Sequence, residues 1–263
     1  MQTYALPLLM LACLLMGCRT PMAPPPAPPP PTAVASGIEI KPIETYHLHL
    51  PGIGGNSPIH RWWCHEIRRA GPTTRSDLYD WTGRRWPIDV LQSVERNRAE
   101  AKNVAREIVA MRRAHPDARI VISCESGGAG PTVWALEELP DDIFVDSLVL
   151  IAPALSPDYD LSHALRHVRG KAHAFISADD NVILAWGTRT YGTIDGKRVN
   201  AAGHSGFVQP DCAEAAQYEK LVQVHHRPAW SKYWNFGGHG GAMSPAFAKH
   251  VIAPLIARGE LPG

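Results

Sequence analysis

Beyond about residue 44, short apolar runs alternate with longer stretches in which apolar and polar residues mix. The nearly continuous apolar runs are typical of buried parallel strands. The long stretches, rich in Ala, Glu and Arg, have the helical period of apolar positions. The pattern predicts strands at 44–50, 77–81, 118–124, 145–151 and 172–176, and helices at 58–71, 89–115, 127–139, 161–168 and 244–258. Strands that alternate with helices predict an α/β fold with a mostly parallel central sheet and helices on both faces.

The amino-terminal segment follows a different pattern. Residues 5–16 form an apolar run of signal-peptide length, ending in Leu-Met-Gly and then Cys18. This string resembles the lipobox of bacterial lipoproteins, although the leading MQTY carries no Lys or Arg. The resemblance implies removal of residues 1–17 as a signal peptide, lipidation of Cys18 and anchoring to the bacterial cell envelope, at the outer membrane because Arg19 follows the cysteine. An ordinary signal peptide remains the alternative.

Residues 18–36 are expected to join the lipid to the folded domain. Residues 21–32 read PMAPPPAPPPPT, and a proline run of this kind adopts an extended polyproline conformation rather than packing in a core. The sequence therefore predicts a tether at 18–36 and one folded domain at 37–263.

Composition narrows the functional classes. The 26 Lys and Arg against 25 Asp and Glu leave a net charge of +1, which argues against a nucleic-acid-binding protein. Hydrophobic residues make up 45% of the chain, enough for a buried core. Five cysteines are too few and too scattered for a disulfide scaffold or a zinc cluster. Pairing of Cys64 with Cys212 after export stays open.

The clearest chemical motif is Cys124-Glu-Ser126-Gly-Gly, between a predicted strand and a predicted helix. It resembles the nucleophile elbow G-x-S-x-G of the α/β-hydrolase family, with Cys124 where the family most often has Gly. The resemblance implies that Ser126 is the nucleophile, and the tight turn is expected to present its hydroxyl to solvent. A serine-glycine turn that only connects two elements is the alternative.

The same resemblance implies an oxyanion hole. The family uses the backbone N–H of the residue after the nucleophile, here Gly127, and one from a loop after an earlier strand. That loop corresponds to Pro51-Gly-Ile-Gly-Gly, with Pro51 where the family's loop has His, so Ile53 is the expected second donor. A phosphate-binding loop at a helix amino terminus is the alternative.

A serine nucleophile needs a histidine base and a carboxylate that orients it. In the family order of Ser, acid, His, the resemblance implies Asp180 as the acid, with its neighbour Asp179 as the alternative. His239, in a glycine-rich loop ahead of the last predicted helix, is the expected base, and His204 is its rival. His47 and His49 share one face of a predicted strand and could in principle bind a metal, although no metal site is expected.

The two resemblances together imply an α/β-hydrolase fold and an exported, lipid-anchored serine hydrolase, a carboxylesterase that forms an acyl-enzyme on Ser126. The resemblance implies no cofactor. Only about twenty residues separate the strands at 145–151 and 172–176, so no lid domain is expected and the site should be open. The expected partners are a small-molecule or polymer ester and, through the lipid anchor, the membrane, with no nucleic acid. The alternative from another class is a non-catalytic surface lipoprotein that uses the fold as a binding module.

Overall fold

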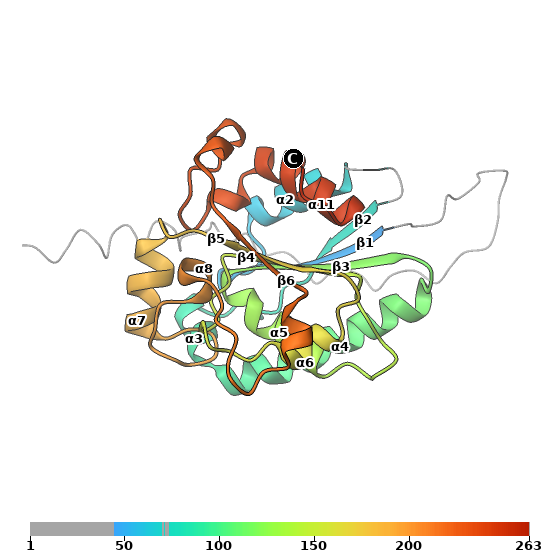
Figure 1. Cartoon of the computed structure of the whole chain (residues 1–263), viewed down its shortest axis with the longest axis horizontal. Coiled ribbons are helices and arrows are strands. Elements are labelled where there is room, and N and C mark those ends of the chain that lie inside the picture. The colour runs from blue at the N-terminus through green and yellow to red at the C-terminus, as the bar shows by residue number, and fades with distance from the viewer. Residues whose placement is uncertain (1–44, 70, 72–73, 263) are drawn as a thin grey trace, which may run out of the picture. The chain divides into compact units, whose positions relative to one another are not determined.

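The computed structural model describes residues 45–69, 71 and 74–262. The predictions for the signal peptide at 1–17, the tether at 18–36 with Cys18, and the domain boundary at 37 lie outside these residues. Within the described part of the chain, the strands form one parallel sheet in the order β2-β1-β3-β4-β5-β6 (Figure 1). The strands are β1 Thr45–Leu50, β2 Thr74–Leu78, β3 Arg119–Glu125, β4 Ser147–Ile151, β5 Ala172–Ile176 and β6 Leu221–His225.

Helices cover both faces of the sheet, with α2 and α11 on one face and α4, α5 and α6 on the other (Figure 1). The α-helices are α2 Pro58–Arg68, α3 Pro87–Gln92, α4 Val94–Ala114, α5 Ala129–Glu137, α6 Ser162–Arg166, α7 Thr188–Tyr191, α8 Ala202–Ser205, α9 Ala215–Tyr218, α10 Pro245–Phe247 and α11 Ala253–Arg258. Further helical segments, of the 3₁₀ or π type, are η1 Ser126–Gly128, η2 Asn181–Gly187, η3 Pro228–Tyr233, η4 Gly241–Met243 and η5 Ala248–Ile252. Between β4 and β5 only α6 is present, so no lid domain is inserted there.

Alternation along the strands produces two apolar cores. On β3, Ile120 and Ile122 pack into the core under α4 and α5, whereas Val121 packs into the core under α2 and α11. The reason is that successive side chains of a strand point to opposite faces. On β1, Leu48 and Leu50 join the first core. Their neighbours His47 and His49 face the second side, where they pack against Trp63 of α2.

The structure corrects several predicted boundaries. Strand β2 occupies 74–78 instead of 77–81, because Asp80 forms a turn in which its Oδ1 accepts the backbone N–H of Thr82 at 3.1 Å. The helix predicted at 89–115 divides into α3 and α4 at Ser93, which has non-helical dihedral angles. The helix predicted at 244–258 divides into α10, η5 and α11, since Pro254 at the start of α11 lacks the N–H that a continuous helix would use.

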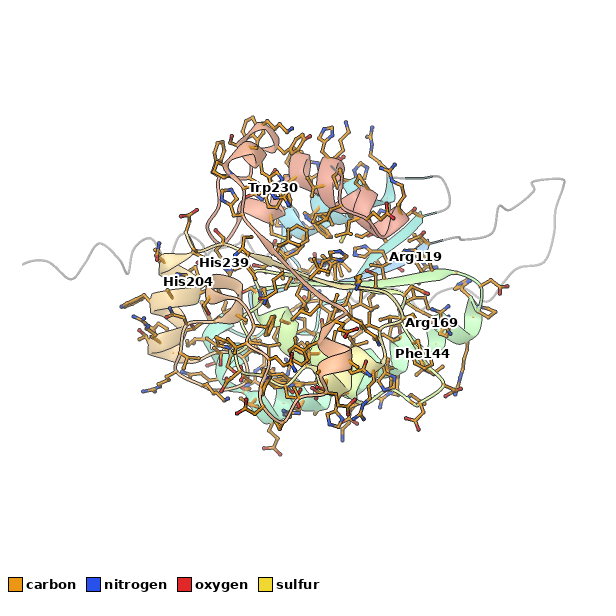
Figure 2. All side chains as sticks on the ribbon, viewed as in Figure 1. Arg119, Phe144, Arg169, His204, Trp230 and His239 are labelled. Carbon is orange, nitrogen blue, oxygen red and sulfur yellow. The ribbon has the colours of Figure 1, made fainter. Side chains whose placement is uncertain are left out.

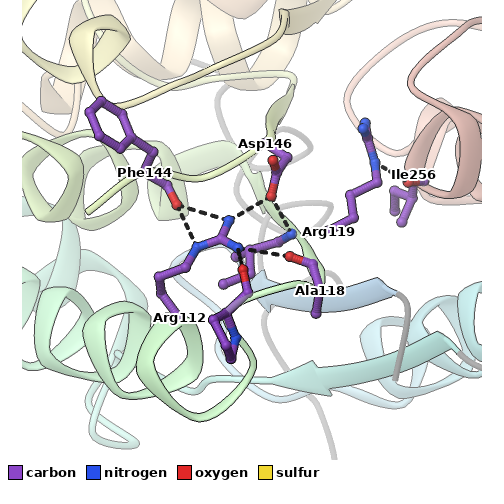
Figure 3. Close-up of polar contacts among 8 residues, drawn as sticks. Arg112, Ala118, Arg119, Phe144, Asp146 and Ile256 are labelled. Carbon is purple, nitrogen blue, oxygen red and sulfur yellow. Dashed lines mark hydrogen bonds and ion pairs between the residues drawn. The ribbon is translucent and has the colours of Figure 1, made fainter. Parts of the chain in front are cut away.

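Arg112 of α4 connects the segments that lead into β3 and β4 through hydrogen bonds and an ion pair (Figure 3). Its guanidinium lies 2.6 Å from Asp146 Oδ2 and donates to the carbonyls of Phe144 and Ala118. The same Asp146 oxygen accepts the backbone N–H of Ile120 at 2.7 Å. Each charge at this nearly buried pair therefore has several polar partners, as buried ion pairs require, and we interpret the cluster as structural.

Both cysteines whose pairing the sequence left open are free thiols in the structure. Cys64 is buried in α2, whereas Cys212 is exposed. Among the described residues, no helix is both long enough and apolar enough to cross a membrane.

Candidate active site

Ser126 occupies a sharp turn where β3 meets the helical segment η1. Its φ of +52° lies in the left-handed region that non-glycine residues rarely adopt. The turn is tight enough that a Cβ added to Gly128 would lie 2.5 Å from the Pro51 carbonyl oxygen. Ser126 as a residue is only 6% exposed, and the direction of its hydroxyl stays a prediction. Gly52 packs against the Cβ of this serine.

The loop that follows β1 lies on this turn. A Cβ added to Gly127 would be 2.5 Å from Ile53 Cγ2, so the two residues are in direct contact. Trp81 fixes the loop by donating its indole N–H to the Pro51 carbonyl at 2.6 Å. The structure therefore brings Ile53 and Gly127 together, while their role as oxyanion donors stays a prediction.

Asp180 follows β5 and is held by the start of η2. Its Oδ1 accepts the backbone N–H groups of Ile183 and Leu184, each at 3.2 Å. Its other oxygen, Oδ2, lies 2.6 Å from Nδ1 of His239. Because the side chain is buried and held from both sides, the carboxylate has a fixed orientation toward the imidazole.

His239 lies on a glycine-rich loop after β6. Gly237 and Gly238 have φ angles of +81° and +68°, which favour glycine. The Gly238 N–H donates to Ser177 Oγ at 2.9 Å, which ties the loop to the end of β5. In Figure 2, His239 lies toward one end of the strands, and Arg119, at the start of β3, lies toward the other.

The two rival residues lie elsewhere. Asp179 is largely exposed and lies 3.6 Å from Nδ1 of His226, on the outer side of the loop. His204 lies with its Nε2 3.4 Å from the side-chain oxygen of Asn181. In the described structure, no hydrogen bond or ion pair joins either of them to His239 or Ser126.

Glu125, which sequence reasoning did not select, completes the site. Its Oε1 lies 3.1 Å from Nε2 of His239. No hydrogen bond joins the Ser126 hydroxyl to His239 anywhere in the described residues. The structure thus joins Asp180 and His239 directly, and at the remaining ring nitrogen it places Glu125 where a triad would have the serine.

The two carboxylates determine the charge of His239. Burial acts to lower its pKa, but the hydrogen bond to Asp180 and the contact with Glu125, together with both negative charges, raise that pKa overall to about 10. Burial acts to raise the pKa of Glu125, but the hydrogen bond and positive charge of His239, together with the Gly52 N–H, bring it below its ordinary value. His239 is therefore a cation between two carboxylates in the free protein at neutral pH.

His47 and His49 lie behind this site and are fully buried. Their ring nitrogens hydrogen-bond to serines and to His60. In the described part of the chain, no group of three or more His, Cys, Asp or Glu side chains is arranged to hold a metal ion. Two sequence signals could have revealed this region: an acidic residue directly before the elbow serine, and histidines at alternate positions of an otherwise apolar strand.

Once His239 has lost its Nε2 proton, the arrangement can accept and return a proton at that nitrogen. An imidazole that is fixed at Nδ1 by a buried carboxylate keeps Nε2 for proton transfer. Ile53 and Gly127, whose backbone N–H groups are the predicted oxyanion donors, are in contact at the elbow.

Comparison with known proteins adds the fold family. No family model matches this sequence, and no curated protein matches it either. Among solved structures, the chain is similar to lipase B of Aspergillus fumigatus, with a TM-score of 0.52 and 13% identity over 85% of this chain and 55% of the lipase. It therefore spans about half the length of that lipase. It is also similar to a dienelactone hydrolase from Anabaena variabilis, with a TM-score of 0.50 and 15% identity over 84% of this chain and 89% of the other. With its parallel sheet and strand-turn-helix serine, the chain has an α/β-hydrolase-type fold.

Proposed function

We propose that this protein is a serine hydrolase that cleaves carboxylic esters through an acyl-enzyme on Ser126. The observation that carries the proposal is the 2.6 Å contact between Asp180 Oδ2 and His239 Nδ1. Asp180 follows the carboxyl end of β5, and the strained Ser126 follows the carboxyl end of β3. The structural neighbours named a lipase and a dienelactone hydrolase are consistent with this chemistry.

In the proposed reaction, Ser126 Oγ attacks the ester carbonyl and its proton passes to Nε2 of His239. Asp180 holds the ring through Nδ1 and stabilises the imidazolium. The N–H groups of Gly127 and Ile53 bind the oxyanion. The imidazolium then protonates the leaving alcohol, and water hydrolyses the acyl-enzyme by the reverse sequence of proton transfers. Because Nε2 carries a proton and contacts Glu125 in the free protein, His239 must first release that proton to solvent and exchange Glu125 for Ser126 when substrate binds.

Covalent labelling tests the proposal. A fluorophosphonate probe should label the wild-type protein and leave Ser126→Ala unlabelled, because the probe reacts only with an activated serine. Hydrolysis of p-nitrophenyl esters of graded chain length would then define the acyl preference. Absence of both labelling and hydrolysis from a folded protein would reject the proposal.

The contact of His239 with Glu125 in place of Ser126 also suits the second candidate, a non-catalytic protein that uses this fold for binding. Fluorophosphonate labelling also separates the two candidates, because a folded binding module would not react with the probe. We further propose, from the residues around Cys18 alone, that the chain is exported and anchored by a lipid on that cysteine.

A further inference from the structure

A line of buried polar side chains extends from Glu125 away from the active site. It crosses three neighbouring strands, where a sheet covered by helices normally carries aliphatic residues. The line consists of Ser76, His47, Ser123, His49 and His60, which we call the histidine-serine chain. All five residues are less than 10% exposed.

Strand register builds this chain. His47 is aligned with Ser76 of β2, and His49 with Ser123 of β3. Nδ1 of His47 lies 2.8 Å from Ser76 Oγ, and its Nε2 lies 2.8 Å from Ser123 Oγ. The same Ser123 oxygen lies 2.7 Å from Nδ1 of His49. These distances make an unbroken hydrogen-bonded line across β2, β1 and β3.

The line continues through α2 to the active site. Nε2 of His49 lies 3.0 Å from Nδ1 of His60, and Nε2 of His60 lies 3.9 Å from Glu125 Oε2. The other oxygen of Glu125 contacts His239. Glu125 is therefore the junction between the histidine-serine chain and the ring that would act as base.

An ionised Glu125 favours one direction for the hydrogen bonds of the chain. Burial lowers the pKa of His47 to about 3 and also lowers the pKa values of His49 and His60. Each ring is therefore neutral at pH 7, with one donor and one acceptor nitrogen. Nε2 of His60 is 3.9 Å from Glu125, too far for a hydrogen bond, but the negative charge favours the tautomer with its N–H on that side, so Nδ1 of His60 accepts from His49. By the same reasoning His49 accepts from Ser123, Ser123 from His47, and His47 from Ser76.

Every donated hydrogen in this arrangement points toward Glu125. The aligned dipoles stabilise negative charge on that carboxylate, in the way that backbone dipoles stabilise anions elsewhere. The far end, Ser76, is buried next to the Cys64 thiol. The chain therefore has no solvent-exposed end there through which to release a proton, which favours charge stabilisation over proton conduction.

We propose that the histidine-serine chain keeps Glu125 ionised, and that Glu125 is a positioning residue that holds His239 as a cation, away from Ser126, until substrate enters. The inference deepens the proposed function and rests on it for its catalytic meaning. Two other titratable groups in the described residues face this cluster. Asp180 hydrogen-bonds to His239, and the negative charge of Asp80 acts to raise the pKa of His60.

The proposal predicts how activity depends on pH. His239 can take the Ser126 proton only after its own Nε2–H bond has broken and that proton has passed to solvent, which its partly exposed ring allows. The acidic limb of the kcat/KM profile should therefore have its midpoint well above the ordinary histidine value of 6.5. Glu125→Gln removes one of the two carboxylates, so this midpoint should move to lower pH.

Direct titration of His239 provides the decisive experiment, because it does not depend on turnover. The ring is followed by NMR in histidine-labelled protein, with its signal assigned by its absence from His239→Gln. Glu125→Gln should lower the His239 pKa by about one unit or more, the usual effect of a carboxylate at this distance. The matched control is Glu137→Gln, since Glu137 is a partly buried carboxylate of α5 that bonds Tyr159 instead. An unchanged His239 titration in Glu125→Gln would overturn the proposal.

A second pair of variants tests the chain itself. Ser123→Ala breaks the line in its middle, so the carboxyl pKa of Glu125, measured by carbon NMR, should rise. Ser147→Ala is the control, because Ser147 is a buried serine of the same sheet that bonds the Lys171 carbonyl. If both alanine variants leave Glu125 unchanged, the chain does not stabilise it and that part of the proposal fails.

The outcomes separate this inference from the proposed function. If no probe labels Ser126 but the His239 and Glu125 titrations shift as described, ester hydrolysis is rejected and the Glu125 inference stands. If esters are hydrolysed but the titrations do not shift, the reverse holds. Should Glu125→Gln fail to fold, a wild-type His239 that titrates near 6.5 would by itself overturn the inference.

Discussion

Glu125 Oε1 lies 3.1 Å from Nε2 of His239, the ring nitrogen that a serine nucleophile would use. The opposite nitrogen, Nδ1, is held by Asp180 at 2.6 Å. A histidine between two carboxylates is stabilised as a cation. The free protein is thus arranged to store a proton at the place where the proposed reaction must accept one.

Removing the nucleophile or the base should abolish turnover. We expect Ser126→Ala and His239→Ala each to lower kcat for a p-nitrophenyl ester by about 10⁴ or more, and the double variant to be little worse, because triad members act as a unit. His204→Ala is the control, with circular dichroism to verify folding. A His204→Ala protein without activity beside an active His239→Ala protein would show that the base is misassigned.

The two neighbouring aspartates should differ sharply. Asp180→Asn should lower kcat by about 10⁴, since an amide at this place favours the wrong histidine tautomer. Asp179→Asn should leave kcat within about twofold of wild type, because Asp179 is exposed and faces His226. Steady-state kinetics of both variants decide between them, and an inactive Asp179→Asn would reverse the assignment.

Acid should destabilise the fold through its buried histidines. The folded-state pKa of His47 is lowered to about 3, below its unfolded value of about 6.5. The unfolded chain therefore binds more protons in this range, so stability is full above pH 6.5 and is lost as pH falls toward 3. Within this pH range, each histidine that stays neutral in the folded protein lowers the free energy of unfolding by about 1.4 kcal/mol for each unit that the pH falls.

Urea unfolding at several pH values between 7 and 5 measures this slope. His47→Gln should reduce the slope, whereas His65→Gln, at an exposed position of α2, should preserve it. An equal slope in wild type and His47→Gln would contradict the assignment of His47 as a neutral buried ring.

The elbow should not tolerate a methyl group at Gly128. A Cβ there would lie 2.5 Å from the Pro51 carbonyl oxygen and 2.7 Å from that of Leu50, and backbone atoms cannot move aside easily. Gly128→Ala should lower the free energy of unfolding by about 1–3 kcal/mol. Gly54→Ala is the matched control, since nothing lies within 4 Å of its Cβ position. Equal midpoints of thermal unfolding for the two variants would refute the tight elbow.

Lipidation at Cys18 is tested in cells. Cys18→Ala should remain unlipidated and should leave the membrane fraction, because a stable anchor needs its acyl chains. Metabolic labelling with a fatty-acid analogue and fractionation of the envelope measure both effects. Membrane association that survives the change unaltered would reject the lipobox reading.

Sequence periodicity was sufficient for the α/β class, because buried parallel strands and amphipathic helices leave local patterns that need no tertiary information. The elbow could be located for the same reason: Ser126 and its glycines are adjacent in sequence. The pattern was less informative at element ends. The break at Ser93 and the interruption before Pro254 depend on single residues inside otherwise helical stretches.

The contacts of the site depended on tertiary structure. The choice of Asp180 over Asp179 as the partner of His239 is made by the turn after β5, which buries one side chain and leaves its neighbour in solvent. The contact between Glu125 and His239 joins residues more than a hundred positions apart, and no local pattern encodes such a distance. The histidine-serine chain arises from strand register, which aligns His47 with Ser76 and His49 with Ser123. Register is fixed by packing of the whole sheet, so only the folded chain decides which polar residues meet.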